Sequence, residues 1–504
     1  MQGGRVVKRS LLFNLVLLAS LHADVVMPPI FGDHMVLQQG VTLPVWGSAS
    51  PCEHVSVSVG NLSEETVADA SGKWRITLRP LPSSSDPLVM VINGNNRLEL
   101  RDVIVGDVWI CAGEANMAFP LSDAASGKES DEKIADEKLR FFQYESSFEL
   151  NEPQIETQAV PRKGRWVVCS QESAPTFSAV GYFFARDLRT SHHLPIGMIQ
   201  CTKKNSPIVS WISQRALTKS PSISPFLSSG LEVRNSQPGL CFEQLIHPLI
   251  PYAITGTIWY QGESDEGSVA LQYRRILPRM IRDWRERWGE GPFPFYCVSQ
   301  AGFGDEEGSV VESYHAQTGN PTTGRALPWF REGTACALSL PFTGIAQACD
   351  LGIADERIPP DKLDVGRRLA LLARHRVYEE EIVDSGPLYR GMNVVKGNGN
   401  DNNKIRVTFD SVRGGLVLGV SPWKSEGFSP SPVTSLKGFA LAGADRKWFP
   451  AQGHIEGDTV LLWSDAIPHP LSVRYCWRGF PNGTLYNKEG LPAAPFRTDT
   501  DQPE

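Results

Sequence analysis

Alternating apolar and polar residues predict β-strands in the first part of the chain. Valine occupies every second position of residues 54–60, and residues 74–78 alternate in the same way. Residues 89–100 read as a strand, a turn rich in Asn, and a second strand. Because few helical patterns interrupt these segments, we expect residues 24–105 to form an N-terminal β-sandwich-like domain.

The pattern changes at about residue 106, where continuous apolar runs begin to alternate with helical ones. Residues 271–288 and 362–377 carry apolar side chains at helical spacing. Buried strands that alternate with helices are typical of a parallel sheet, and ligands bind such sheets at the carboxyl ends of the strands. We therefore predict an α/β domain over residues 106–385, with candidate site loops at 106–120 and 259–267. The runs with the composition of fully buried strands are residues 107–111, 196–200, 256–260 and 293–297.

Strand patterns return in the last part of the chain, at residues 404–409, 459–463 and 471–475. Turn residues separate these segments, so we expect a C-terminal β region over residues 386–504. The predicted fold class is thus α/β, with a parallel-sheet domain flanked by N-terminal and C-terminal β domains.

The first 23 residues have the features of a secretory signal peptide. Arg5, Lys8 and Arg9 form a basic region, residues 11–21 are mostly apolar, and a small residue precedes a possible cleavage site before Asp24. The apolar stretch is too short for a comfortable membrane span, although an uncleaved anchor is the alternative. We therefore expect a secreted or periplasmic protein, with no membrane span after removal of residues 1–23.

The composition excludes several classes of function. Hydrophobic residues make up 41% of the 504 residues and charged residues 21%, which is typical of packed globular domains. A net charge of -7 leaves no basic surplus for nucleic acid. The nine cysteines are scattered singly, and neither CxxC nor HExxH spacing occurs, so we predict no metal and no other cofactor. Some cysteines could pair in an oxidising compartment, although Cys169 and Cys297 lie in apolar runs typical of buried thiols.

Four segments resemble sequence blocks of the sialate O-acetylesterase family. Residues 106–117 read Gly-Asp-Val-Trp-Ile-Cys-Ala-Gly-Glu-Ala-Asn-Met, close to the family's G-D-V-W-x-C-S-G-Q-S-N-M. Residues 246–264 contain Ile-His-Pro-Leu and Trp-Tyr-Gln-Gly-Glu-Ser, which resemble a second block. Residues 32–47 and 448–498 resemble the family's N-terminal and C-terminal regions. Because the blocks occur in order over nearly the whole mature chain, the sequence is identified as a member of that family.

The resemblance implies a fold and an activity. Members are extracytoplasmic SGNH-type hydrolases, so it implies an SGNH-like, three-layer parallel-sheet domain within this chain. They remove acetyl groups from sugar hydroxyls, notably on sialic acid. Their acyl transfer uses a serine nucleophile, a histidine base and an oxyanion hole of backbone N–H, Gly and Asn. The expected partner is therefore an acetylated sugar or glycan.

This sequence departs from the family at each of those functions. The nucleophile falls on Ala115 and the base on Pro359. The oxyanion-hole glycine falls near Lys204 or Asn205, and the oxyanion-hole Asn falls on Asp265, whose negative charge would repel a developing oxyanion. A methyl group cannot attack an ester, and proline has no group that takes up a proton. We therefore predict a catalytically impaired pseudoenzyme that binds glycan.

Six positions in the same loops are candidates for sugar binding. Five of them match the family residue, whereas Glu114 stands where the family has Gln. The six candidates are Glu114, Asn116, Met117, Gln261, Gly262 and Glu263.

Two other hypotheses stay open. The first is an active carbohydrate O-acetylesterase with a rearranged site, in which Cys111 or Ser264 replaces the lost serine. The second is a purely structural extracellular protein whose cleft is filled, for example by Lys203 and Lys204. The sequence names neither the sugar nor the oligomeric state. Other candidate groups for a rearranged site are Ser122, His247, His315, Asp355 and Glu356.

Overall fold

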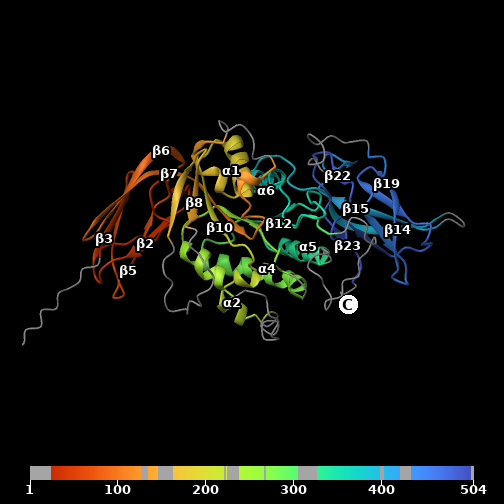
Figure 1. Ribbon diagram of the computed structural model, residues 1–504, viewed down its shortest axis with the longest axis horizontal. Coiled ribbons are helices and arrows are strands. Elements are labelled where there is room, and N and C mark those ends of the chain that lie inside the picture. Colours follow the sequence, from red (N-terminus) through yellow and green to blue (C-terminus); the bar gives the residue numbers. More distant parts are fainter. Residues whose placement is uncertain are drawn as a thin grey trace, which may run out of the picture.

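The structure is a computed structural model that describes residues 24–125, 134–145, 163–220, 223, 238–265, 268–304, 326–397, 402–420 and 433–500. Strands from the first and last parts of the chain occupy opposite ends of the molecule, and helices and strands alternate between them (Figure 1). The predicted signal peptide, residues 1–23, lies outside the described residues.

A parallel sheet forms the middle of the molecule. Its strand order is β13-β12-β11-β7-β10-β8, and every neighbouring pair in this order is parallel. One further strand, β9 (Gly164–Cys169), pairs with β8 in the antiparallel direction. The predicted parallel sheet is therefore confirmed. Its strands are β7 (Arg97–Gly113), β8 (Asp136–Tyr144), β10 (Ile196–Thr202), β11 (Gly256–Tyr260), β12 (Phe295–Ser299) and β13 (Thr343–Gln347).

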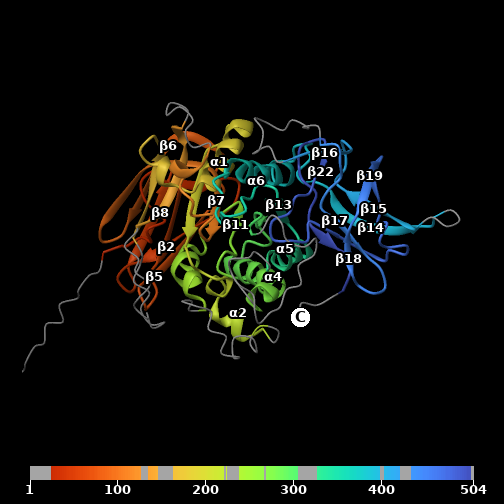
Figure 2. The ribbon, with the colours of Figure 1, turned by 45° about the vertical axis from the view of Figure 1, so that its right-hand side comes forward.

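Helices cover both faces of this sheet (Figures 1 and 2). Successive side chains of a strand point to opposite faces. On β7, Trp109 and Cys111 accordingly pack in one core with α1 and α6, whereas Val108 and Ile110 pack in a second core with α4. No helix in the described part of the chain is long and apolar enough to cross a membrane. The helices are α1 (Ala179–His192), α2 (Gln214–Thr218), α4 (Ser268–Trp288), α5 (Leu327–Ala335) and α6 (Leu363–Arg376).

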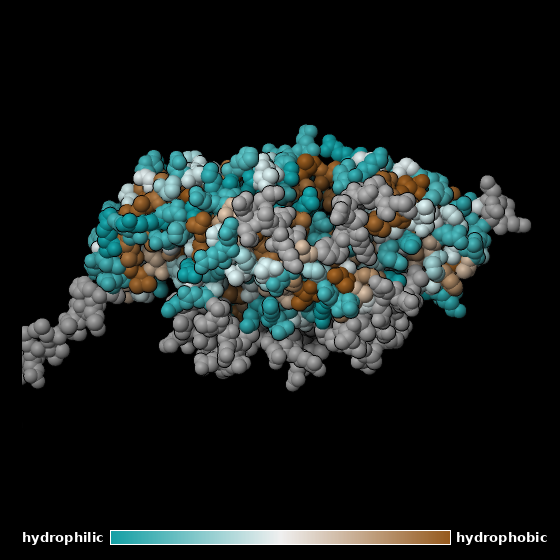
Figure 3. Space-filling model, turned by 45° about the horizontal axis from the view of Figure 1, so that its top comes forward, coloured by the Kyte–Doolittle hydropathy of each residue, from teal (hydrophilic) through white to brown (hydrophobic). Residues whose placement is uncertain are grey.

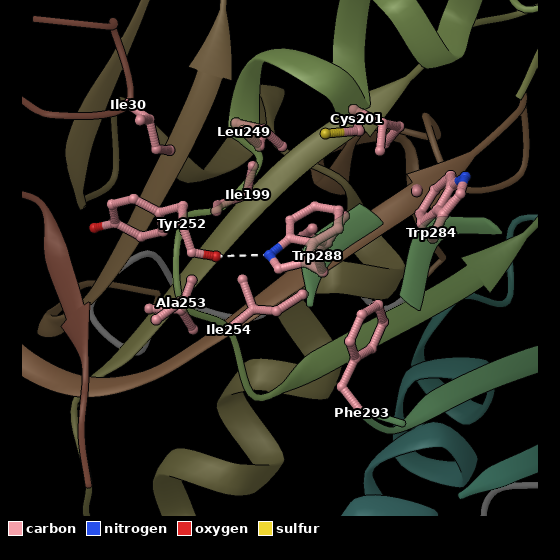
Figure 4. Close-up of a cluster of buried hydrophobic side chains, with 14 of the residues drawn as sticks. Ile30, Ile199, Cys201, Leu249, Tyr252, Ala253, Ile254, Trp284, Trp288 and Phe293 are labelled. Carbon is pink, nitrogen blue, oxygen red and sulfur yellow. Dashed lines mark hydrogen bonds between the residues drawn. The ribbon is translucent and has the colours of Figure 1, made fainter. Parts of the chain in front are cut away.

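The aromatic core beneath α4 explains part of the second family block. Tyr252, Ala253 and Ile254 lie among buried aromatic side chains in Figure 4. The indole nitrogen of Trp288 donates a hydrogen bond to the carbonyl oxygen of Tyr252 at 2.8 Å. The beginning of the block, residues 246–254, therefore contributes to packing, and only its end reaches the carboxyl edge of the sheet.

The N-terminal strands continue directly into the parallel sheet. The first half of β7 pairs antiparallel with β6, and its second half pairs parallel with β10 and β11. This one strand crosses the boundary that we predicted between residues 105 and 106. The strands before it are β1 (Val36–Gln38), β2 (Leu43–Ser48), β3 (His54–Val59), β4 (Leu62–Val67), β5 (Lys73–Leu78) and β6 (Ser84–Asn93).

Small antiparallel sheets make up the described C-terminal part of the chain. They share a buried core that includes Phe439, Tyr475 and Phe496. The division of the whole chain into domains at 105/106 and 385/386 stays a prediction. The strands are β14 (Leu388–Val395), β15 (Lys404–Asp410), β16 (Leu416–Leu418), β17 (Phe439–Ala442), β18 (Trp448–Pro450), β19 (Gln452–Glu456), β20 (Thr459–Trp463), β21 (Ser472–Tyr475), β22 (Leu485–Asn487) and β23 (Phe496–Arg497).

All nine cysteines are free thiols, so the structure contains none of the disulfides that the sequence allowed. Cys169 and Cys297 are buried, as predicted. On the face shown in Figure 3, hydrophobic side chains form separate patches among hydrophilic ones, which is ordinary for a globular protein.

Candidate active site

The first site loop begins where β7 ends. Gly113 has a φ of 145°, and a side chain at this position would collide with the carbonyl group of Tyr260 on the neighbouring strand β11. The same carbonyl accepts a hydrogen bond from the N–H of Glu114 at 3.0 Å. The chain then turns through Ala115, which is 9% exposed and has only a methyl group at the nucleophile position of the family.

The second site loop follows β11 and contains Gln261 to Asp265. Gly262 has a φ of 131°, and a side chain there would run into the aromatic ring of Phe330 on α5. This close approach places Glu263 and Asp265 against the first loop and the turn after β10. Glu263 is 7% exposed and Asp265 is 3% exposed. The two loops therefore meet in the interior of the protein and not in open solvent.

Glu114 joins the two loops. Its carboxyl group accepts hydrogen bonds from the hydroxyl of Ser264, from the N–H of Ser264 at 3.1 Å and from the side-chain amide of Gln261 at 3.4 Å. Burial, together with the nearby Glu263 carboxylate, raises the pKa of Glu114 to about 9. At neutral pH this side chain is therefore a protonated acid and not a base.

Asn116 joins three loops. Its backbone N–H and its side-chain amide both donate to the same oxygen of Glu263, each at 2.6 Å. Its side-chain oxygen accepts a hydrogen bond from the amino group of Lys362 at 2.6 Å. Lys362 is fully buried, 4.9 Å from the ring centre of Phe119. Burial lowers the pKa of Lys362 to about 7.

Asp265 stabilises the turn that follows β10. Its two carboxylate oxygens each lie 3.1 Å from the N–H of Ile208, and one of them accepts a hydrogen bond from Gln261 at 2.5 Å. Burial raises the pKa of Asp265 to about 7. The carboxyl group of Asp265, for which the resemblance implies the oxyanion-hole position, is thus bonded to groups of the protein itself.

The remaining two positions named from the family lie in the loops that these bonds connect. Asn205 is exposed at the tip of its turn, with a φ of 56°. Pro359 is buried. It lies in the sequence between two residues that contact Asn116: Arg357, whose carbonyl oxygen is 3.4 Å from the Asn116 amide, and Lys362. The loops that carry Ala115, Asn205, Asp265 and Pro359 therefore meet at the carboxyl ends of the parallel strands. The functional roles given to these residues stay predictions.

Of the two proposed substitute nucleophiles, the structure favours only Ser264. Cys111 is fully buried, its sulfur lies 3.6 Å from the carbonyl oxygen of Ile199, and burial raises its pKa. Because a thiolate is needed for attack, Cys111 is an inert core residue. Ser264 is half-buried, and its hydroxyl donates a hydrogen bond to the carboxyl group of Glu114.

Two of the other candidate groups form their bonds outside this network. Ser122 is exposed and bonds to the neighbouring Asp123 at 2.9 Å. His247 is exposed and pairs with Glu243 at 2.7 Å. Asp355 and Glu356 are exposed in the loop before Pro359. His315 lies outside the described residues.

Sequence reasoning missed two residues of the network. We gave Lys362 no role, and Gln300 lies just beyond β12 with no motif around it. Gln300 donates to the carbonyl oxygen of Gln261 at 2.8 Å and approaches Glu263 at 3.4 Å. In the described part of the chain, no group of three or more His, Cys, Asp or Glu side chains could hold a metal ion.

Comparisons with known proteins agree with the sequence blocks. A family model described as carbohydrate esterase, sialic acid-specific acetylesterase, matches residues 105–324. A sialate O-acetylesterase from Mus musculus is 25% identical over 530 residues, which cover 92% of each chain. One from Homo sapiens is 27% identical over 391 residues, which cover 70% of this chain and 71% of the relative.

A solved structure extends the likeness over the whole fold. The crystal structure of a carbohydrate acetylesterase from Xanthomonas citri matches with a TM-score of 0.80 and 34% sequence identity. The match covers 94% of this chain and 100% of that one. Since the likeness spans the full fold and the sequence blocks occur in order, this chain belongs to the sialate O-acetylesterase family of carbohydrate esterases.

Proposed function

We propose that this chain is a glycan-binding pseudoenzyme of the family, without acetyl-ester hydrolysis. One observation carries the proposal: the polar groups that surround the nucleophile position are bonded to one another. Glu114 is held by Ser264, and Asn116 by Glu263 and Lys362. Ala115 supplies no attacking atom among them.

Each chemical step of acyl transfer lacks its group in this site. The nucleophile position is Ala115 and the base position is Pro359. In subtilisin, loss of the serine or the histidine alone lowers the rate by on the order of 10⁶. The resemblance gives Asp265 the position of an oxyanion donor, and its oxygens accept hydrogen bonds from Ile208 and Gln261.

Glycan binding is supported by family membership and by the retained loop residues. Asn116, Met117, Gln261, Gly262 and Glu263 match the family sequence, and all five are buried. We propose that they form the floor on which the ligand rests, with acetylated sialic acid, the substrate named for the family, as the first sugar to test. We also propose that the chain is exported, because residues 1–23 have the features of a signal peptide. Mass spectrometry of the exported protein should then show a mature chain that begins at Asp24.

A second candidate function rests on the pair of Ser264 and Glu114. A serine hydroxyl that donates to a carboxyl group could attack an ester if the carboxylate removed its proton. Because burial raises the pKa of Glu114 to about 9, this carboxylate forms only in alkaline solution. An active esterase of this kind would therefore gain activity as the pH rises toward 9, and Ser264→Ala would abolish it.

Two readings on one sample test the proposed function. Purified mature protein is mixed with O-acetylated sialic acid, and acetate release and binding heat are recorded together. We expect binding without acetate release above the rate of buffer alone. Acetate release that Ser264→Ala removes would favour the second candidate, and absence of binding would favour a purely structural protein.

A further inference from the structure

Helix α4 carries a row of arginines on its solvent side. Arg275, Arg279 and Arg282 are four and three residues apart, so they share one side of the helix. Arg279 pairs with Glu286 at 3.2 Å, whereas the exposed Arg275 and Arg282 pair with no acidic side chain in the described part of the chain. This side of α4 therefore carries a surplus of positive charge, in a protein whose net charge is -7.

The short helix α2 extends this charge. Figures 1 and 2 show α2 beside α4, and the hydroxyl of Ser213, which caps α2, donates to Asp283 of α4 at 3.0 Å. Arg215 and Lys219 of α2 are exposed and form no ion pair within the residues that the structure describes. Five cations of the two helices make up what we call the basic face: Arg215, Lys219, Arg275, Arg279 and Arg282.

An apolar turn adjoins the basic face just before β13. It consists of Leu338, Pro341 and Phe342, which are all exposed. Phe342 is 59% exposed and is the one aromatic residue among the exposed large hydrophobic side chains of the described residues. The guanidinium of Arg285 donates to the carbonyl oxygen of Phe342 at 3.4 Å. Because Arg285 lies one helical turn after Arg282, the apolar turn is next to the basic face.

The backbone of Phe342 has a conformation that disfavours a bulky side chain. Its φ is 54°, in the left-handed region that bulky residues rarely adopt. The carbonyl group of Phe342 accepts a hydrogen bond from the N–H of Phe295 at 2.9 Å, in addition to that from Arg285. Strained conformations of this kind cluster at functional sites. An exposed ring gains little packing energy to offset the strain, so the apolar turn is a candidate contact for a partner.

We propose that the basic face and the apolar turn bind an anionic lipid surface. The cations of α2 and α4 attract acidic lipid headgroups, and the side chains of Leu338 and Phe342 enter the apolar boundary beneath those headgroups. Charge alone would fit any acidic polymer. The exposed aromatic ring beside the charges favours a lipid surface, because only the lipid offers that ring an apolar environment.

This surface is separate from the family site. Phe342 directly precedes β13, so the apolar turn lies at the amino end of that strand, whereas the site loops lie at the carboxyl ends of the parallel strands. A lipid surface bound here leaves the family site open to solvent. The inference therefore goes beyond glycan binding and does not depend on it.

Vesicle flotation tests this surface. The chain that begins at Asp24 is mixed with vesicles of phosphatidylcholine alone, or of equal amounts of phosphatidylcholine and phosphatidylglycerol. It lacks the apolar residues 11–21, which therefore cannot account for binding. We expect binding to the mixed vesicles to be tighter by about tenfold or more, and added salt should weaken it.

Three variants examine the two parts of the surface. Arg282→Gln should weaken binding to the mixed vesicles about fivefold. Arg413→Gln is the matched control, because Arg413 is an exposed arginine of the C-terminal β region without an ion pair in the described residues, and it should bind like wild type. Phe342→Asn removes the ring and suits a left-handed backbone, so it should weaken binding on the order of fivefold without lowering the melting temperature.

Three results would overturn the lipid assignment. The first is equal binding of the two kinds of vesicle. The second is unchanged binding by Arg282→Gln or by Phe342→Asn. The third is binding to soluble polyglutamate that is as tight as binding to the mixed vesicles and that Phe342→Asn leaves unchanged, which would identify an acidic polymer as the partner.

Discussion

At the scale of single residues, the positions that depart from the family's catalytic residues lie among internal hydrogen bonds. The family resemblance places Ala115 and Pro359 where the attacking and proton-accepting groups are expected. Glu114 and Asp265 each replace a neutral amide of the family with a carboxyl group, and each of these groups accepts hydrogen bonds from neighbouring loops. Under the proposed function, the groups at these positions hold the loops together and do not act on substrate.

Restoring one catalytic side chain should not restore activity. We expect Ala115→Ser to release acetate from an acetylated sugar no faster than wild type, because a serine without a base stays protonated and is a weak nucleophile. Pro359→His alone should fail for lack of a nucleophile. The double variant should give a trace at most, since Asp265 still opposes an oxyanion. Rapid turnover by Ala115→Ser alone would mean that another group serves as the base.

Glu263 should stabilise the protein by accepting two hydrogen bonds from N–H groups of Asn116. Glu263→Ala leaves both buried donors without their acceptor, and we expect a loss of about 3 kcal/mol of folding free energy. Glu263→Gln retains an acceptor oxygen in the same place and should cost less than half as much. Melting temperatures followed by circular dichroism compare the two variants, and an equal fall for both would contradict this role.

At the scale of elements, the sequence predicted the buried strands of the parallel sheet, and the division into domains stays a prediction. The strands of the parallel sheet could be recognised in the sequence, because a strand that is buried on both faces forms an uninterrupted apolar run. In β7, however, an alternating half-exposed pattern changes to a fully buried one within a single strand. We predicted a domain boundary at this change, and in the structure the strand leaves an antiparallel neighbour here and enters the buried parallel sheet.

The site network was harder to predict than the elements that carry it. Asn116 bonds to residues 147 and 246 positions away along the chain, and common residue types such as Lys and Gln give no local signal of such pairing. The family blocks pointed to the site loops. They did not reveal the hydrogen bonds between the loops, because a sequence block contains no information on contacts. The role of Lys362 became visible only when the loops were placed together.

The close packing of α5 against the second site loop is testable at Gly262. A methyl group at this position would enter the space of the Phe330 ring, and the φ of 131° disfavours any residue with a side chain. Gly262→Ala should therefore destabilise the protein by about 3 kcal/mol. Gly32→Ala is the matched control, because nothing lies within 4 Å of its added methyl group. Equal melting temperatures for the two variants would contradict this packing.

At the scale of the whole molecule, the buried carboxyl groups make stability depend on pH. Burial raises the pKa of Asp265 to about 7, above the value of about 3.9 for an unfolded aspartate. A group of this kind stabilises the folded state fully below the unfolded pKa and loses that contribution as the pH rises through the folded pKa. Asp361, whose pKa is raised to about 7 by burial and by Asp364, adds in the same direction.

Asp265→Asn isolates this effect, since Asn stays neutral at every pH and still offers an oxygen to Ile208. We expect the variant and wild type to melt at similar temperatures near pH 4. Between pH 4 and pH 8 the variant should become more stable relative to wild type, by on the order of 5 °C. A difference that stays constant over this range would show that Asp265 does not titrate with folding.

The central claim, that this chain lacks acetyl-ester hydrolysis, is tested most directly by acetate release from O-acetylated sialic acid between pH 5 and pH 10. Ser264→Ala protein serves as the control for spontaneous alkaline hydrolysis, because it retains every other group of the site. We predict that wild type and Ser264→Ala release acetate at the same rate as buffer alone at every pH. A wild-type rate that exceeds the control and rises with the ionisation of Glu114 near pH 9 would contradict the claim and identify Ser264 as the nucleophile of an active esterase.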